Sequence, residues 1–276
     1  MLKISQLFIY PVKSLGGISV AYAQLTGRGL LHDRRWMLVD ENNLFLTQRE
    51  YPQMALLQTA ISETGIQIFH KQQPDKKILI PFHPVIKEKI TVQVWDDTCE
   101  AVTMSSETNE WFSTQLQIPC RLVYMPDDSL RKVDSNYAVH NTDITGFSDG
   151  YPLLMIGQAS LDELNRRLTE PLPMNRFRPN IVFTGGKPHE EDEMENFITG
   201  DINFYGVKLC ARCMVTTTNQ DTGERGKEPL KTLSAYRMKN NNVYFGQNAL
   251  YNKPGRLSVG DAISILRRKQ GLEPDV

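Results

Sequence analysis

The chain has 276 residues, a formal net charge of -1 at pH 7 and 40% hydrophobic residues. This length predicts two domains or one elaborated unit, because a domain commonly holds roughly 100 to 200 residues. The near-zero charge argues against a surface for a nucleic acid polymer or a polybasic membrane anchor, while it allows a local basic pocket for one small anion.

The amino terminus alternates apolar and polar residues over residues 3–10, which predicts a strand and not a signal peptide. No apolar run is long enough to suggest a membrane span. Four cysteines in a chain of this length give no disulfide framework. We therefore expect a cytoplasmic protein.

The turn at residues 12–17 carries Lys13 and Ser14 beside two glycines. A lysine point charge, a hydroxyl and exposed backbone amides can together grip an anion. A solvated lysine in an ordinary polar turn is the alternative.

A second strand is expected over residues 32–39, with Arg34 and Arg35 side by side. Alternation along a strand sends neighbouring side chains to opposite faces, so one arginine should point toward the interior or a ligand. Pairing of either arginine with Asp33 is the alternative.

Short apolar runs separated by turn residues fill residues 44–102 and predict a small antiparallel barrel or sandwich. A helix over residues 106–116, with Ser106 as its cap, and a strand over residues 121–125 follow. The polar stretch at residues 126–143 has little periodicity. We place the domain junction at its start, which gives domains 1–125 and 126–276.

The second half begins with a strand over residues 151–156 and a capping box, Ser160 to Glu163, that predicts a helix start. Arg178 and Asn180 flank a proline before the next strand, where they form a rigid donor cluster unless Arg178 is only a surface charge. The acid-rich segment 185–195 is expected to be a solvent-facing loop.

A Cys-x-x-Cys motif, Cys210 to Cys213, follows a strand over residues 201–209. An arginine between the cysteines favours the thiolate, which is the form that binds metal. Structural zinc would need two further Cys or His ligands, and a redox pair would need a helix after the motif. The β-branched residues 215–218 instead favour continued strand. An inert, buried cysteine pair remains an alternative interpretation of the motif.

The Cys-Ala-Arg-Cys motif resembles that of the MOSC family, and most closely that of the mitochondrial amidoxime-reducing components and their bacterial relatives. The resemblance also rests on residues 10–14, 33–36, 94–95, 176–180, 228–233 and 259–261. It implies a mainly β protein with α+β elements. An N-terminal antiparallel β-barrel-like domain would precede a MOSC β-barrel with a few short helices.

The resemblance also implies a molybdenum cofactor, Mo-molybdopterin, with Cys213 as the metal ligand and catalytic residue. The residues that match cofactor-binding positions of the family are Lys13, Ser14, Arg34, Arg178, Asn180, Ala211 and Arg212. Ala211 replaces a common serine, so a contact there would come from the backbone alone.

The function that the resemblance implies is reduction of small N-hydroxylated compounds, such as amidoximes and hydroxylamino purines. The sequence has no cysteine set for an iron–sulfur cluster. We therefore expect a separate electron-donor protein that is ferredoxin-like, flavodoxin-like or cytochrome b5-like with its reductase. A molybdenum-cofactor or sulfur carrier without turnover is the alternative, and a cofactor-free structural protein is the third hypothesis.

Overall fold

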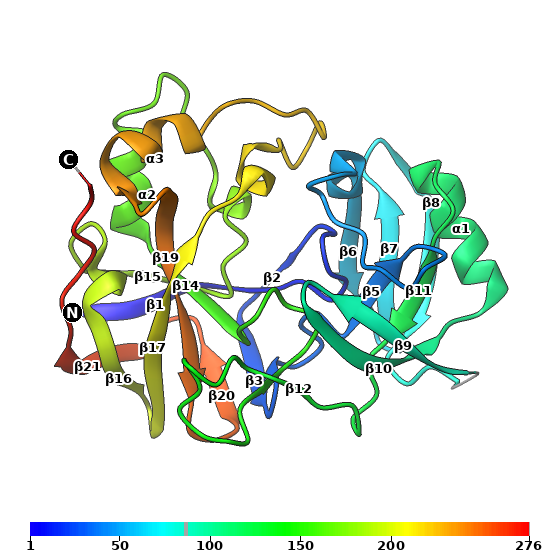
Figure 1. The fold of residues 1–276 in the computed structure, drawn as a ribbon, viewed down its shortest axis with the longest axis horizontal. Helices are drawn as coiled ribbons and strands as arrows, with labels where there is room; N and C mark the ends of the chain where they lie inside the picture. The colour runs from blue at the N-terminus through cyan, green and yellow to red at the C-terminus, as the bar shows by residue number, and fades with distance from the viewer. Residues whose placement is uncertain (86–87, 276) are drawn as a thin grey trace.

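The computed structural model describes residues 1–85 and 88–275, which form two β-rich halves lying side by side (Figure 1). This confirms the expected mainly β fold. Among the described residues, no helix is both long and apolar enough to span a membrane.

One half is a barrel closed by seven of the described strands. β14 pairs with both β15 and β19, which brings the two ends of the sheet together. Alternating buried positions on β1 and β17 turn apolar side chains such as Leu7 and Phe204 into its core. The strands in order are β14 (Leu153–Gly157), β15 (Ile181–Thr184), β1 (Leu2–Ile9), β21 (Ala262–Arg268), β16 (Met194–Thr199), β17 (Ile202–Ala211) and β19 (Asn242–Tyr251).

The other half contains two antiparallel sheets and a helix. Trp36 and Phe112 are fully buried between them, and the α1 N-cap is Ser105, whose hydroxyl accepts from the Thr108 amide, and not the expected Ser106. The elements are β5 (Trp36–Val39), β11 (Arg121–Tyr124), β10 (Asp97–Thr103), β9 (Lys89–Val94), β6 (Leu57–Ile61), β7 (Gly65–His70), β8 (Gln73–Pro81) and α1 (Ser106–Leu116).

Short elements join the halves and cover the barrel. In Figure 1, α2 and α3 lie at one end of the barrel, where they pack on the core around Phe177 and Phe245. The remaining strands are β2 (Ile18–Val20), β3 (Tyr22–Thr26), β4 (Gly29–Leu30), β12 (Arg131–Lys132), β13 (Ile144–Thr145), β18 (Met238–Lys239) and β20 (Gly255–Ser258). The helices are α2 (Gln158–Asn165) and α3 (Leu230–Arg237), with 3-10 turns η1 (Pro52–Leu56), η2 (Met174–Arg176), η3 (Glu190–Glu193) and η4 (Met214–Thr217).

Two local predictions in the second half are wrong. The capping box fails because α2 begins after Gly157, so Ser160 lies inside the helix and its hydroxyl donates to Glu191. Segment 185–195 is not a solvent-facing loop, because Glu191 is fully buried and Asp192 is 2% exposed. Tertiary partners override the local polar pattern at both places.

The first strand belongs to the barrel of the second half. β1 pairs with β15 and β21, and β3 pairs with β20. The division of the chain at residues 125 and 126 stays a prediction, while the strand pairing shows that residues near the amino terminus complete the barrel.

Candidate functional site

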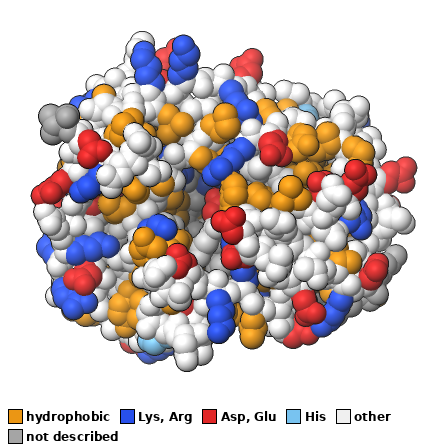
Figure 2. Space-filling model, in the orientation of Figure 1, with side chains coloured by type: hydrophobic (Ala, Val, Ile, Leu, Met, Phe, Trp, Pro, Cys, Tyr) orange, Lys and Arg blue, Asp and Glu red, His pale blue; other side chains and the backbone are white. Residues whose placement is uncertain are grey.

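A cavity of about 270 Å³ lies where residues of the two halves meet, and it collects every residue that the sequence predicts for the site. Figure 2 shows this face of the molecule hollowed near its centre. The predicted residues that line the cavity are Lys13, Ser14, Arg34, Arg178, Asn180, Ala211, Arg212 and Cys213.

The loop after β1 brings a lysine to the cavity wall. Lys13 is 5% exposed, and its Nζ lies 2.5 Å from a carboxylate oxygen of Asp149. Burial lowers the pKa of Lys13, and the attraction of Asp149 opposes this shift. The next residue, Ser14, adopts a left-handed backbone with φ 67°, and its carbonyl accepts from the Gln48 side chain at 2.6 Å.

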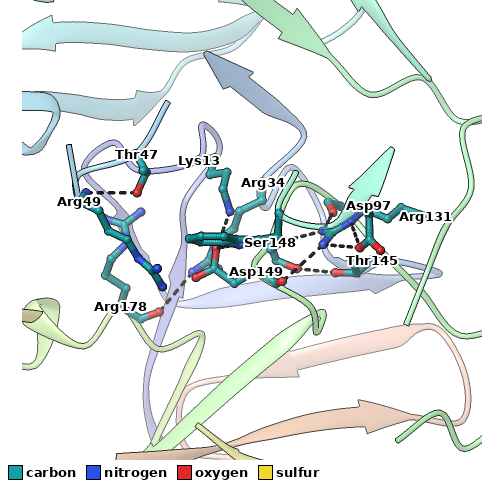
Figure 3. A network of polar contacts seen from close by, with 12 residues as sticks. Lys13, Arg34, Thr47, Arg49, Asp97, Arg131, Thr145, Ser148, Asp149 and Arg178 are labelled. Carbon is teal, nitrogen blue, oxygen red and sulfur yellow. Dashed lines mark hydrogen bonds and ion pairs between the residues drawn. The ribbon is translucent and has the colours of Figure 1, made fainter. Parts of the chain in front are cut away.

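Sequence reasoning did not find Asp149, the one acidic residue among those lining the cavity. Burial favours a raised pKa, but the Lys13 ammonium and hydrogen bonds from Lys13 and Trp95 hold the pKa of Asp149 below its ordinary value. Its loop is fixed from behind by Arg131, which donates to the carbonyls of Gly146 and Ser148 at 3.0 and 2.5 Å (Figure 3). The cavity therefore holds an ionised, rigidly placed carboxylate.

Two arginines enclose a buried tyrosine ring. The guanidinium carbons of Arg34 and Arg178 lie 4.2 and 4.3 Å from the centre of the Tyr10 ring. Burial raises the Tyr10 pKa to about 12, so the phenol stays neutral and serves as a packing surface.

Arg34 is not on a strand as expected, because β5 begins at Trp36 and Arg34 lies in a turn with φ 46°. The turn still directs the side chains of Arg34 and Arg35 to different partners. Arg34 holds both carboxylate oxygens of Asp33 at 2.8 and 2.7 Å, while Arg35 reaches Asp127 at 2.7 Å.

Arg178 and Asn180 line the cavity in different ways. Among the described residues, the Arg178 guanidinium has no hydrogen-bond partner, and burial lowers its pKa to about 10, which leaves it charged at pH 7. The Asn180 amide instead donates to the Phe8 carbonyl at 3.2 Å and accepts from the Leu154 amide at 3.2 Å. Asn180 fixes β1 against β14, and its expected contact with a cofactor stays a prediction.

The Cys-x-x-Cys motif lies at the end of β17. Arg212 donates to the Cys210 sulfur at 2.9 Å and to the Phe177 carbonyl at 2.7 Å, while its buried Nε has no partner among the described residues. Burial raises the pKa of the Cys210 thiol, although Arg212 opposes the shift. Cys213 is half-buried and lines the same cavity.

The chain does not continue as a strand after Cys213. Residues 214–217 form the 3-10 turn η4, which overturns the prediction from the β-branched run. The hydroxyls of Thr216 and Thr217 donate to the carbonyls of Cys213 and Met214 at 3.0 and 2.8 Å, and these local bonds compete with strand pairing.

Three further cavity residues were missed by sequence reasoning: Trp95, Arg49 and Lys208. Arg49 lies 4.1 Å from the centre of the Trp95 ring, and the Lys208 ammonium lies 4.2 Å from that of Tyr137. Period-two spacing from Cys210 could have indicated Lys208. Nothing in the local sequence brings Arg49 to Trp95, since the two come from distant segments.

The charge balance of the cavity is strongly positive. Six basic residues and one acidic residue line it, in a chain whose overall charge is near zero. Low-dielectric walls strengthen such a field, so the cavity favours an anionic ligand.

Comparison with known proteins gives a consistent result over both halves. Residues 1–119 match the MOSC N-terminal beta barrel domain and residues 142–264 match the MOSC domain. The mitochondrial amidoxime-reducing component 1 of Mus musculus is 32% identical over 95% of this chain and 82% of its own length. The chain belongs to the MOSC family.

Two further relatives are similar over most of this chain. The mitochondrial amidoxime reducing component 2 of Homo sapiens is 32% identical over 94% of this chain and 82% of its own length. A molybdenum cofactor sulfurase of Oryza sativa subsp. japonica is 31% identical over 88% of this chain but 32% of its own length. Among solved structures, the YUAD protein of Bacillus subtilis aligns over 95% of this chain and 94% of its own, with 10% identity and a TM-score of 0.38.

The zinc alternative for the cysteine motif lacks further ligands. In residues 1–85 and 88–275, no group of three or more His, Cys, Asp or Glu side chains is arranged to hold a metal. The other two cysteines, Cys99 and Cys120, are buried in cores of the first half.

Proposed function

We propose that the protein is a molybdenum-cofactor-dependent reductase of small N-hydroxylated compounds that takes electrons from a separate protein. The observation that carries this proposal is the cavity itself, which is lined by Cys213 and by Arg178, whose guanidinium has no hydrogen-bond partner among the described residues. Relatives that are 32% identical to this chain are named for amidoxime reduction, which supports the choice of substrate class.

The residues of the cavity fit the proposed cofactor. Its phosphate and pterin need cationic forks and hydrogen-bond donors, and Arg178 offers all its guanidinium donors unused by the described chain. Among the described residues, the buried Nε of Arg212 has no hydrogen-bond partner, so its N–H is available to donate to a ligand beside the cysteines. In this proposal Lys13, Ser14, Arg34, Asn180 and the Ala211 backbone complete the binding set.

Cys213 would hold the metal, since it is half-buried and lines the same cavity as the unused donors of Arg178. When bound, the cofactor supplies the two-electron redox chemistry of the reaction. Two electrons and two protons convert the N–OH group to N–H and water.

The chain's own residues would orient the substrate and exclude water from it. Because Lys13 and Trp95 keep Asp149 ionised, its carboxylate would accept a hydrogen bond from the substrate and would not donate a proton. Arg131 keeps this carboxylate in place through the loop behind it.

The deciding experiment is metal analysis and turnover of protein made in cells that synthesise molybdenum cofactor. We expect about one molybdenum per chain in the parent and reduction of an amidoxime with an artificial electron donor. Cys213→Ser should lose turnover, whereas Cys210→Ser should keep its molybdenum. Full turnover by Cys213→Ser, or a parent without molybdenum, would refute the proposal.

A carrier of cofactor or sulfur is the second candidate, because a molybdenum cofactor sulfurase is among the relatives. It predicts a parent that contains molybdenum, shows no turnover with any N-hydroxylated compound, and passes its molybdenum to a cofactor-free acceptor enzyme. The same preparation separates the two candidates.

A further inference from the structure

The basic residues of the cavity differ in how their charge is satisfied. Lys13 pairs with Asp149, Arg34 with Asp33, and Arg212 bonds a sulfur and a carbonyl. The Lys208 ammonium lies against the Tyr137 ring. Two guanidinium groups, those of Arg178 and Arg49, donate no hydrogen bond to any residue that the structure describes.

Arg178 has a role in the proposed cofactor site, whereas Arg49 has none. Figure 3 shows both arginines at the end of the polar network away from Arg131. Arg49 comes from the segment between β5 and η1 of the first half, so it reaches the cavity from the wall that does not carry the cysteines. It is therefore placed to contact a second ligand in the same cavity.

The backbone of Arg49 is fixed on both sides. Its amide donates to the Thr47 hydroxyl at 3.2 Å, and its carbonyl accepts from the Arg225 guanidinium. Thr47 is 6% exposed. The side chain thus starts from a rigid position.

The guanidinium of Arg49 is fixed as well, because it lies 4.1 Å from the centre of the Trp95 ring. That ring is itself held by a hydrogen bond from its Nε1 to Asp149 at 3.2 Å and by the edge-on contact with Phe45, with ring centres 4.6 Å apart. Stacking on an aromatic face leaves the in-plane N–H donors of an arginine free. Arg49 therefore offers a pre-organised fork with no anion attached.

An arginine cannot relieve an unpaired charge by releasing its proton at neutral pH, so a fork of this kind is satisfied only by an acceptor from outside the chain. The planar geometry matches the two oxygens of a carboxylate or of a phosphate. In the proposed function the N-hydroxylated group reacts beside Cys213, so the Arg49 fork is available to a different part of the substrate.

We propose that Arg49, stacked on Trp95, binds an anionic substituent of the substrate, so that the preferred substrates are N-hydroxylated compounds that also carry a carboxylate or phosphate. This inference rests on the proposed function for the reacting group. It assigns Arg49 a role in substrate selection.

The test compares two probes of similar size, 4-carboxybenzamidoxime and its neutral 4-carbamoyl counterpart, with the molybdenum-loaded protein. In the parent, we expect the carboxylate probe to have the lower KM. In Arg49→Gln that KM should rise about tenfold or more, as for loss of a charge-assisted hydrogen bond, while kcat for the neutral probe changes less than about twofold.

Arg256→Gln is the matched control. Arg256 also stacks at 4.1 Å on an aromatic ring, that of Tyr22, but it is exposed on β20 and does not line the cavity. This variant removes the same charge and the same kind of contact, and both KM values should stay at the parent's level.

Two further readouts test whether the anion that Arg49 binds belongs to the substrate or to the cofactor. Molybdenum content of Arg49→Gln equal to that of the parent supports a substrate role, whereas loss of molybdenum would assign Arg49 to the cofactor phosphate and overturn the inference. An equal rise in KM for both probes would also overturn it.

Equilibrium binding of the carboxylate probe, measured by calorimetry without an electron donor, tests Arg49 independently of turnover. Weaker binding to Arg49→Gln than to the parent supports the inference, and equal binding contradicts it. If the parent reduces neither probe, the proposed function fails while this binding measurement still decides on Arg49.

Discussion

Two clusters of charged side chains in the described residues differ in how many of their charges find a partner. In the acidic cluster of η3, defined as Glu190, Glu191 and Asp192, two carboxylates pair with arginines from other elements: Asp192 with Arg237 and Glu190 with Arg268. In the basic cavity, Arg49 and Arg178 have no anion within the described chain.

The comparison separates charges that the fold pairs from charges for which the described chain supplies no anion. The third carboxyl, Glu191, has no arginine partner in the part of the chain that the structure describes. Burial and the nearby Asp192 charge raise its pKa to about 7, so it can take up a proton. A guanidinium group stays protonated at neutral pH and cannot lose its charge in this way. Unpaired arginines in a cavity therefore indicate an external anion more strongly than unpaired carboxyls do.

The largest expected effect comes from removing an arginine partner of the acidic cluster. Asp192 and Arg237 are 2% and 5% exposed and lie 2.5 Å apart, so Arg237→Met leaves a buried carboxylate without its cation. We expect the free energy of unfolding to fall by about 3 to 5 kcal/mol, measured by urea denaturation. A change below about 1 kcal/mol would mean that water or another cation replaces Arg237.

A smaller effect concerns pH. The raised pKa of Glu191 means that the folded chain holds a proton that the unfolded chain releases between about pH 4.5 and pH 7, so Glu191 makes stability fall as pH rises through this window. His189, whose pKa burial lowers to about 3, gives the opposite slope up to its ordinary value of 6.5.

The Glu191→Gln variant separates the pH dependence that comes from Glu191 from the one that comes from His189. Relative to the parent, Glu191→Gln should become more stable by about 2 kcal/mol as pH increases from 4.5 to 7, in denaturation curves taken at matched ionic strength. The Asp192 charge, which raises the pKa of Glu191, is the same in both proteins. A pH-independent difference would show that Glu191 is ionised throughout.

For the unpaired cluster, the change in stability should be small. Arg178→Gln removes a buried cation but also its contact with Tyr10, so the free energy of unfolding of the cofactor-free protein should change by less than about 1 kcal/mol. Molybdenum content should fall several-fold. Undiminished molybdenum together with a large stability loss would make Arg178 a structural residue.

The smallest effect sets the baseline for the comparison. Lys253 and Asp201 form an ion pair at 2.5 Å on the surface, where the Asp201 side chain is 83% exposed. Asp201→Asn should leave the midpoint of the same urea denaturation curve unchanged within its error. A lower midpoint would weaken the link between burial and pairing on which the other predictions rest.

Much of the site could be predicted from sequence because its residues lie in short motifs with strong local chemistry. Lys13 lies two residues after Pro11, Arg178 directly precedes Pro179, and Cys213 lies three residues after Cys210. Lys13, Arg178 and Cys213 all line one cavity. Periodicity likewise predicted most of the strands.

The remaining features depend on contacts between distant segments. Arg49 meets Trp95, and Asp149 meets Lys13, across separations that no local pattern encodes. The burial of residues 190–192 depends on arginines from α3 and β21, which turn a hydrophilic segment into part of the interior. A polar pattern alone therefore indicates exposure only when no distant partner exists.

The position of β1 in the barrel bears on the order in which the chain can fold during synthesis. This strand leaves the ribosome before its partners β2, β15 and β21, and the last of these ends only at Arg268. Contacts between such distant segments form slowly, and an unpaired strand is prone to wrong association while it waits. The nascent chain must therefore carry an open barrel seam until β21 has emerged.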